Sequence, residues 1–179
     1  MTKIVELNDR RQFRILLNPV RQDILHLLRR TGRPMTASAV ADRMMLSPTA
    51  AHEHLRKLVE LGVAERAAVS GSPAAHYRLA DVEIHLNLGR MDEYRGEREA
   101  LAAQLVDGTF RRVLHTAEAG GVKGEADCQL FKFGALHLKP EERVELAGLI
   151  DSYLRTHGTS KPGAENWEYV LMAYRADDR

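Results

Sequence analysis

Apolar residues recur at helical spacing after Pro19, between stretches of turn residues. The apolar residues that follow Pro19 are spaced i, i+4, i+7 and i+8, and they are Val20, Ile24, Leu27 and Leu28. This spacing places the four side chains on one face of a helix. A shorter helix is expected over 11–17, and the turn residues of 31–34 end the longer one. The pattern predicts two helices joined at Asn18-Pro19, because proline suits a first helical turn.

Two further helices are indicated by their capping residues. Thr36 is suited to cap a helix that runs to about Met45. Ser47 is a preferred N-cap residue and Pro48 suits the first helical position, so the next helix begins there. The residues that face inward along this second helix are Ala51, Leu55 and Leu58. Gly62 fits a left-handed C-cap, so we predict a helix over 47–61.

A β-hairpin is expected directly after this helix. Residues 63–69 and 75–79 are predicted strands, and the loop Ser70-Gly71-Ser72-Pro73 joins them. Two helices separated by a short turn and followed by a hairpin form a winged helix-turn-helix. In this fold the second helix enters the major groove, about 12 Å wide, with an exposed polar face. Residues 47–62 combine such a face with a small apolar face that packs on the preceding helices.

The outward face of helix 47–61 carries groups that hydrogen-bond to nucleic acid. Thr49, His52 and Arg56 can donate to base edges or phosphates. Glu53 can accept from a cytosine amino group. The hairpin adds side chains for phosphate or minor-groove contact. The candidate DNA-binding residues are Ser47, Pro48, Thr49, His52, Glu53, Arg56, Arg66, His76 and Arg78.

The second half of the chain is predicted to be helix, strand, helix and strand. A long helix is expected over 88–119, and Asp107-Gly108-Thr109 is the place for a break. Pro140 opens a second helix that runs to about Thr156, with acidic residues at its positive end. The strands are expected over 129–138 and 167–174 because their side chains alternate.

The fold class is therefore α+β, mainly α. A winged helix-turn-helix domain is expected over 10–88, followed by a long helix and a small helix/strand domain over 89–179. The apolar residues along the long helix are Tyr94, Leu101, Leu105, Phe110 and Leu114. A chain this small has few partners to bury them, so we expect a homodimer interface here, with packing inside one subunit as the alternative. The C-terminal domain is also a candidate for binding a small-molecule effector that the sequence does not identify.

Charge is distributed unevenly along the chain. The net charge is +1, but residues 1–81 carry 13 Lys and Arg against 8 Asp and Glu, and residues 82–179 carry 13 against 17. A basic, arginine-rich half suggests binding to a polyanion, although chance gives the same asymmetry. No apolar run approaches the roughly 18–20 residues that span a bilayer. The first residues lack a signal-peptide core, so a cytoplasmic location is expected.

Four stretches of the first half resemble the ArsR-type winged-helix repressors. They are Leu17–Leu25, Val40–Ser47, Pro48–Leu58, which is similar to the family's recognition helix, and Leu61–Ala64, which leads into the wing. The resemblance covers residues 10–88 and implies a homodimeric DNA-binding transcription regulator. The DNA-reading positions that it implies are Pro48, Thr49, His52, Glu53 and Arg56. Glu53 departs from the histidine often seen in the family, so no base preference is carried over.

A metal-sensing repressor is one alternative, because many relatives in that family sense metals. Their paired-cysteine site falls here on Thr36-Ala37-Ser38, which holds no soft ligand. Their second site lies in the long helix, which here offers only His115 and Glu118, fewer than a four-coordinate zinc site needs. The single Cys128 excludes an intrachain disulfide, and a buried thiol is the plainer interpretation. No metal ligand or cofactor is therefore assigned.

A winged helix used only for protein interaction is the other alternative. That function favours an uncharged outer face, where this chain has Arg56 and Lys57. Enzymatic activity is not expected, because the chain has no phosphate-cradling glycine loop, nucleophile elbow or paired histidine-carboxylate motif. The operator, the regulated genes, and repression as against activation are not determined by the sequence.

Overall fold

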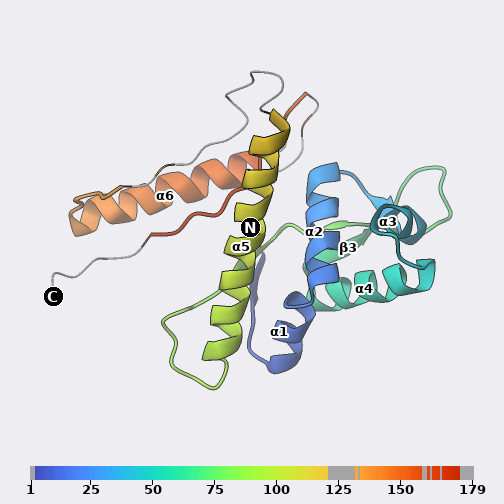
Figure 1. Ribbon diagram of the computed structural model, residues 1–179, viewed down its shortest axis with the longest axis horizontal. Helices are drawn as coiled ribbons and strands as arrows, with labels where there is room; N and C mark the ends of the chain where they lie inside the picture. Colours follow the sequence, from blue (N-terminus) through green and yellow to red (C-terminus); the bar gives the residue numbers. More distant parts are fainter. Residues whose placement is uncertain are drawn as a thin grey trace. The chain divides into compact units, whose positions relative to one another are not determined.

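The computed structural model describes residues 3–120, 132, 134–158, 161, 163–165 and 167–173 (Figure 1). The chain divides into two compact units, Met1–Leu105 and Val106–Arg179. The elements of the first unit are β1 (Lys3–Glu6), α1 (Arg10–Leu16), α2 (Pro19–Thr31), β2 (Met35–Thr36), α3 (Ala37–Met44), α4 (Pro48–Leu61), β3 (Ala64–Ala67), β4 (His76–Leu79), β5 (Val82–His85) and the start of α5 (Arg95–Gly120). The second unit contains the rest of α5 and α6 (Pro140–His157).

The predicted ends of α2, α3 and α4 are confirmed by their caps. The side chains of Asn18, Thr36 and Ser47 each accept a backbone N–H at the start of α2, α3 and α4. A cap of this type contributes about 1 kcal/mol to helix stability. Gly32 and Gly62 end α2 and α4 at φ of 60° and 84°, the left-handed conformation that glycine adopts without steric cost.

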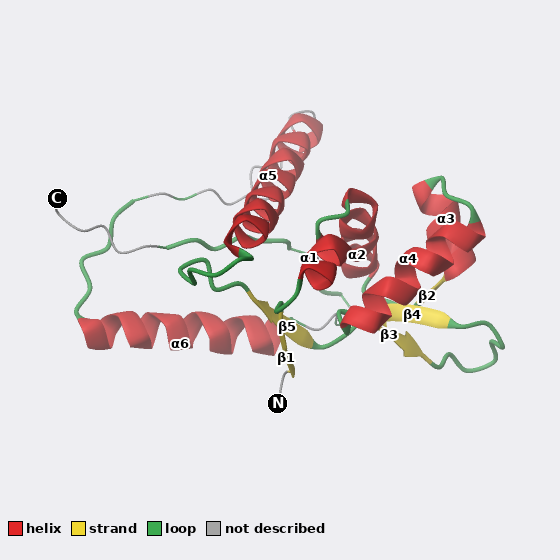
Figure 2. Ribbon diagram, turned by 90° about the horizontal axis from the view of Figure 1, so that it is seen from below, coloured by secondary structure: helices red, strands yellow, loops and turns green. Residues whose placement is uncertain are grey.

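The predicted hairpin is present and forms most of a three-stranded sheet. Strands β3 and β4 pair antiparallel, with Glu65 opposite Arg78. Strand β2 adds to the other edge of β4, with Met35 opposite Tyr77. Figure 2 shows this sheet beside α4, which contacts β3. The helix pair α3–α4 and the hairpin together form the expected winged helix-turn-helix.

A second, two-stranded sheet was not predicted. Strand β1 pairs in parallel with β5, from Lys3 opposite Val82 to Glu6 opposite His85. Val5 in the middle of β1 is buried. The two strands are four residues long and lie far apart in the sequence, so no local turn signal announces their pairing.

The core of the first unit is built from one face of each helix. The apolar residues with no exposed surface are Phe13, Ile24, Val40, Ala51, Leu55, Leu58 and Leu101. A charged residue, Arg21 in the first turn of α2, is also buried. Its Nε and Nη2 donate to the backbone oxygens of Ile15 and Arg14, at 2.5 and 2.7 Å. The buried guanidinium therefore satisfies carbonyls at the end of α1, and its burial lowers the pKa of Arg21.

The long helix differs from its prediction at both places that the sequence singled out. It begins at Arg95, and residues 86–94 are not helical. Arg98 holds this preceding loop: its Nη2 donates to Asp92 Oδ1 at 2.7 Å and to the backbone oxygen of Arg90. The helix also continues unbroken through Gly108, because one glycine inside a helix is a small cost that its neighbours outweigh.

The two strands predicted in the second half are wrong where the structure describes them. Residues 134–139 and 167–173 belong to no helix or strand. Leu136 and Tyr169 are more than half exposed, so neither segment packs one face on a core. Alternation predicts a strand only when a partner strand supplies the hydrogen bonds. Residues 129–131, 133 and 174, as well as Cys128, lie outside the described residues.

The predicted second helix of this half is confirmed as α6, although none of its residues is buried. Within the described parts of the chain, no helix is both long enough and apolar enough to cross a membrane.

Candidate nucleic-acid interface

Helix α4 has one buried and one exposed face. Ala51, Leu55 and Leu58 have no exposed surface. Pro48 and Thr49 at the start of the helix are exposed. Ser47 is committed to the cap, where its Oγ accepts the backbone N–H of Ala50 at 3.1 Å. The first turn therefore presents the positive end of a helix to solvent, next to two side chains predicted to face DNA.

His52 is held more closely than a fully outward position predicts. Its side chain is half-buried, and its ring meets Tyr77 of β4 edge to face, with ring centroids 6.2 Å apart. The Tyr77 hydroxyl and His52 Nδ1 lie 3.2 Å apart, within hydrogen-bonding reach. The wing thus positions a residue of α4.

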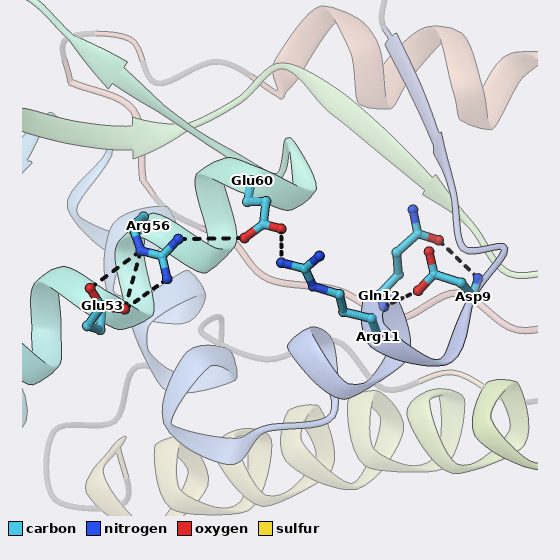
Figure 3. A network of polar contacts seen from close by, with 6 residues as sticks. All are labelled: Asp9, Arg11, Gln12, Glu53, Arg56 and Glu60. Atoms are coloured by element: carbon cyan, nitrogen blue, oxygen red, sulfur yellow. Dashed lines mark hydrogen bonds and ion pairs between the residues drawn. The ribbon is translucent and has the colours of Figure 1, made fainter.

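Glu53 and Arg56 form one unit on the exposed face of α4 (Figure 3). Arg56 Nη2 donates to Glu53 Oε2 at 3.0 Å, and its Nη1 lies 3.9 Å from Glu60 Oε2. The other Glu60 oxygen accepts from Arg11 of α1. The guanidinium hydrogen bond lowers the pKa of the Glu53 carboxyl, and Glu53 in turn raises the pKa of Arg56. The side chains of Glu53 and Arg56 remain about half exposed.

Glu60 and Arg11 were missed by the sequence analysis. The spacing of Glu53, Arg56 and Glu60 at i, i+3 and i+7 was a signal for pairing on one helix face. The contact with Arg11 had no such signal, because it joins two different helices.

The predicted wing residues differ in how far their charge is balanced. Arg78 Nε donates to Glu65 Oε1 at 2.7 Å, across the pair of strands. His76 Nδ1 lies 2.9 Å from the backbone oxygen of Ala74. Arg66 is exposed on β3 and has no ion pair within the part of the chain that the structure describes. Arg66 is thus the wing cation with its charge most available.

His54 lies on α4 next to the buried Leu55. The side chain is partly buried, and burial lowers its pKa, with a further contribution from the Arg21 guanidinium. Within the described ranges, no three His, Cys, Asp or Glu side chains form a group that could hold a metal ion.

Solved structures that are similar to this chain at low identity include the following three. A mutant of ZitR from Lactococcus lactis in apo form is 17% identical, with a TM-score of 0.37, over 81% of this chain and 86% of that one. The heme sensor protein PefR from Streptococcus agalactiae, in complex with heme, is 12% identical, with a TM-score of 0.34, over 79% and 75%. RV1404 from Mycobacterium tuberculosis is 15% identical, with a TM-score of 0.31, over 86% and 76%.

No curated protein matches the chain. Residues 16–67 match the model of a helix-turn-helix domain. The match runs from the end of α1 through β3 and therefore includes α3 and α4. The chain contains a helix-turn-helix domain at this place.

Proposed function

We propose that this chain is a sequence-specific, DNA-binding transcription regulator of the ArsR-like winged-helix type. The observation that carries the proposal is the division of α4 into two faces. Leu55 and Leu58 anchor the helix in the core, whereas Thr49 and Arg56 stand exposed on the other side. An anchored helix with a polar outer face, followed by a hairpin, is the arrangement that reads a major groove.

The interface divides into a reading part and a positioning part. In the reading part, Thr49, Glu53 and Arg56 offer donors and acceptors to base edges. In the positioning part, the start of α4 and the wing residue Arg66 contact the DNA backbone, which orients a protein without reading sequence.

The central test removes Arg56. Duplexes selected from a random DNA pool supply the binding site, and affinity is measured by fluorescence anisotropy at fixed salt. Arg56→Ala is expected to weaken binding by about 1–3 kcal/mol if Arg56 contacts a base. Arg95→Ala is the matched control, because Arg95 is also exposed and ion-paired at i, i+4, with Glu99 at 2.7 Å, but lies on α5.

An unchanged affinity in a folded Arg56→Ala protein would contradict the proposal. The absence of any salt-dependent DNA binding by the wild type would favour a protein-interaction module instead.

We further propose that the protein acts as a homodimer. The apolar residues that were predicted along the long helix divide into two groups. Tyr94 and Leu101 pack into the core of the first unit, where Leu101 has no exposed surface. Phe110 lies two and a half turns beyond Leu101, so it is on the opposite side of the helix. Phe110 and Leu114 are each about half exposed.

The second unit supports a dimer because none of its described residues is buried. Large exposed apolar residues include Phe110, Leu114, Leu149 and Trp167. Exposed apolar side chains that lie together mark interaction sites, and Phe110 and Leu114 are neighbours one turn apart on α5. A second copy also answers a functional need, since one reading helix covers too few base pairs to discriminate a site within a genome.

The dimer is tested by light scattering at low micromolar concentration. Leu114→Glu is expected to reduce the mass toward that of a 20.1 kDa monomer, because it places a charge in the apolar interface. His115→Glu, at the neighbouring exposed position, adds the same charge beside that face and is the control. A wild type that is already monomeric contradicts the proposal.

A further inference from the structure

One cation of the reading helix stands between two carboxylates. Glu53 precedes Arg56 by about one turn and Glu60 follows it by about one turn. We infer that Glu60 is a specificity-determining residue, which together with Glu53 directs Arg56 to the edge of a guanine base and away from phosphate. This inference rests on the proposed DNA-binding function.

Charge is the reason that this array disfavours phosphate. A phosphate that approaches Arg56 meets one cation already shared by two anions, so it must displace at least one carboxylate or suffer repulsion from it. Guanine O6 and N7 are neutral acceptors and meet little such repulsion. The two carboxylates therefore lower the affinity of Arg56 for the backbone more than its affinity for a guanine.

The geometry leaves the donors that a guanine needs. Glu53 accepts from Nε and from Nη2 of Arg56, at 3.0 to 3.4 Å. Glu60 lies 3.9 Å from Nη1, a distance for an ion pair but too long for a hydrogen bond. Because each Nη carries two N–H groups, both Nη1 and Nη2 keep a free donor for a bidentate contact.

Arg11 determines where Glu60 stands. It lies on α1, and its Nη2 donates a hydrogen bond to the Glu60 oxygen that does not face Arg56 (Figure 3). A carboxylate held from the far side loses less freedom when it also orients Arg56. Arg11 is thus a positioning residue, and the array extends from the reading helix to a helix outside the interface.

The experiment compares two DNA duplexes with the full-length protein. One is a strong binder selected from a random pool, and the other has the same length and composition in scrambled order. Glu60→Gln is expected to tighten binding to the scrambled duplex about twofold to fivefold, the range for one exposed ion pair, while affinity for the selected duplex changes less. The ratio of the two affinities therefore falls, and the salt slope steepens by up to about one.

Glu83→Gln is the matched control. It makes the same change of charge on an exposed side chain, but Glu83 lies on β5 and pairs with His85. This variant is expected to change the affinities for both duplexes by the same factor and to leave the ratio of the two affinities unchanged. If Glu60→Gln and Glu83→Gln give the same ratio, the effect is general electrostatics and the inference is wrong.

A second variant tests the guanine contact. Lysine keeps the charge of Arg56 but cannot make a planar bidentate contact. For the wild type, replacing one G·C pair of the selected duplex by A·T is expected to cost about fivefold to 150-fold. Arg56→Lys should lose that dependence at the same pair and still bind the scrambled duplex.

If replacing each G·C pair by A·T weakens binding equally for the wild type and for Arg56→Lys, the inference is overturned, although DNA binding itself stands. If no duplex is enriched from the random pool and the wild type binds no DNA, the proposed function is overturned as well, so the two failures are distinguishable.

Discussion

The hydroxyl of Tyr77 and Nδ1 of His52 lie 3.2 Å apart, and this contact joins the wing to α4. Tyr77 is one of the largest fully buried side chains, on the central strand of its sheet. His52 is on α4, among the residues expected to approach DNA. The orientation of α4 and that of the hairpin are therefore coupled through a side-chain pair as well as through the backbone turn at Gly62.

Tyr77→Phe should weaken that coupling without emptying the core. The ring remains, so we expect the free energy of unfolding to fall by only about 0.5–1.5 kcal/mol, the contribution of a typical hydrogen bond. Urea titrations of Tyr77→Phe, His52→Ala and the double variant measure it. If the losses of unfolding free energy in the two single variants add up to the loss in the double variant, the contact contributes nothing to stability.

The wing is predicted to contribute affinity more than sequence discrimination. Replacing both Arg66 and Arg78 by alanine should weaken binding to all DNA sequences by a similar factor. It should also reduce the slope of log affinity against log salt concentration by up to about two. The single Arg66→Ala change should have the larger effect, because Glu65 already balances Arg78 at 2.7 Å. Loss of discrimination at one base pair alone would instead make the wing a direct reader.

Leu101 should behave as a core residue although it lies on α5. It has no exposed surface, so Leu101→Ala leaves a cavity and is expected to cost about 2–5 kcal/mol in a denaturant titration. Leu105→Ala, one turn further along and 39% exposed, is the control and should cost much less. Equal losses of unfolding free energy in the two variants would contradict the placement of Leu101 in the core.

Stability should depend on the protonation of His54. Burial lowers the pKa of His54 below its ordinary value of 6.5, so the unfolded chain binds the proton more strongly than the folded protein does. The neutral ring's contribution is complete above pH 6.5 and is lost as the pH falls through the lowered folded pKa.

Thermal or urea unfolding of the DNA-free protein between pH 7.5 and about pH 5 measures this dependence. His54→Gln should reduce the loss, whereas the same change at exposed His115 should not. A wild type and a His54→Gln variant with parallel pH profiles would show that other groups carry the dependence.

Much of the first unit was predictable because its signals are local. Asn18, Thr36 and Ser47 each cap a helix by a bond to a backbone N–H three residues away. Gly32 and Gly62 adopt a conformation that their own lack of a side chain permits. The winged helix-turn-helix follows from such signals together with helical spacing of apolar residues.

The sequence pointed to Glu53 and Arg56 as exposed residues of α4, but not to Glu60 and Arg11 beside them. Arg56 and Glu53 were expected to face DNA one by one, and their exposure agrees with that expectation. The pairing of Arg56 with Glu53 and Glu60 follows from helical spacing within α4, whereas the contact of Glu60 with Arg11 depends on how α1 packs near α4. Whether these residues contact DNA stays a prediction.

The amino-acid sequence by itself determined where α2, α3 and α4 begin and end and which of their faces are apolar, since those properties depend on residues within about one turn. Only the tertiary structure decided the parallel pairing of β1 with β5, the burial of Leu101 in the core of the first unit, and the partner of Arg11. It also decided that residues 134–139 and 167–173 form no strand. Each of these depends on a partner distant in the sequence, and alternation or spacing within a segment carries no information about whether that partner is present.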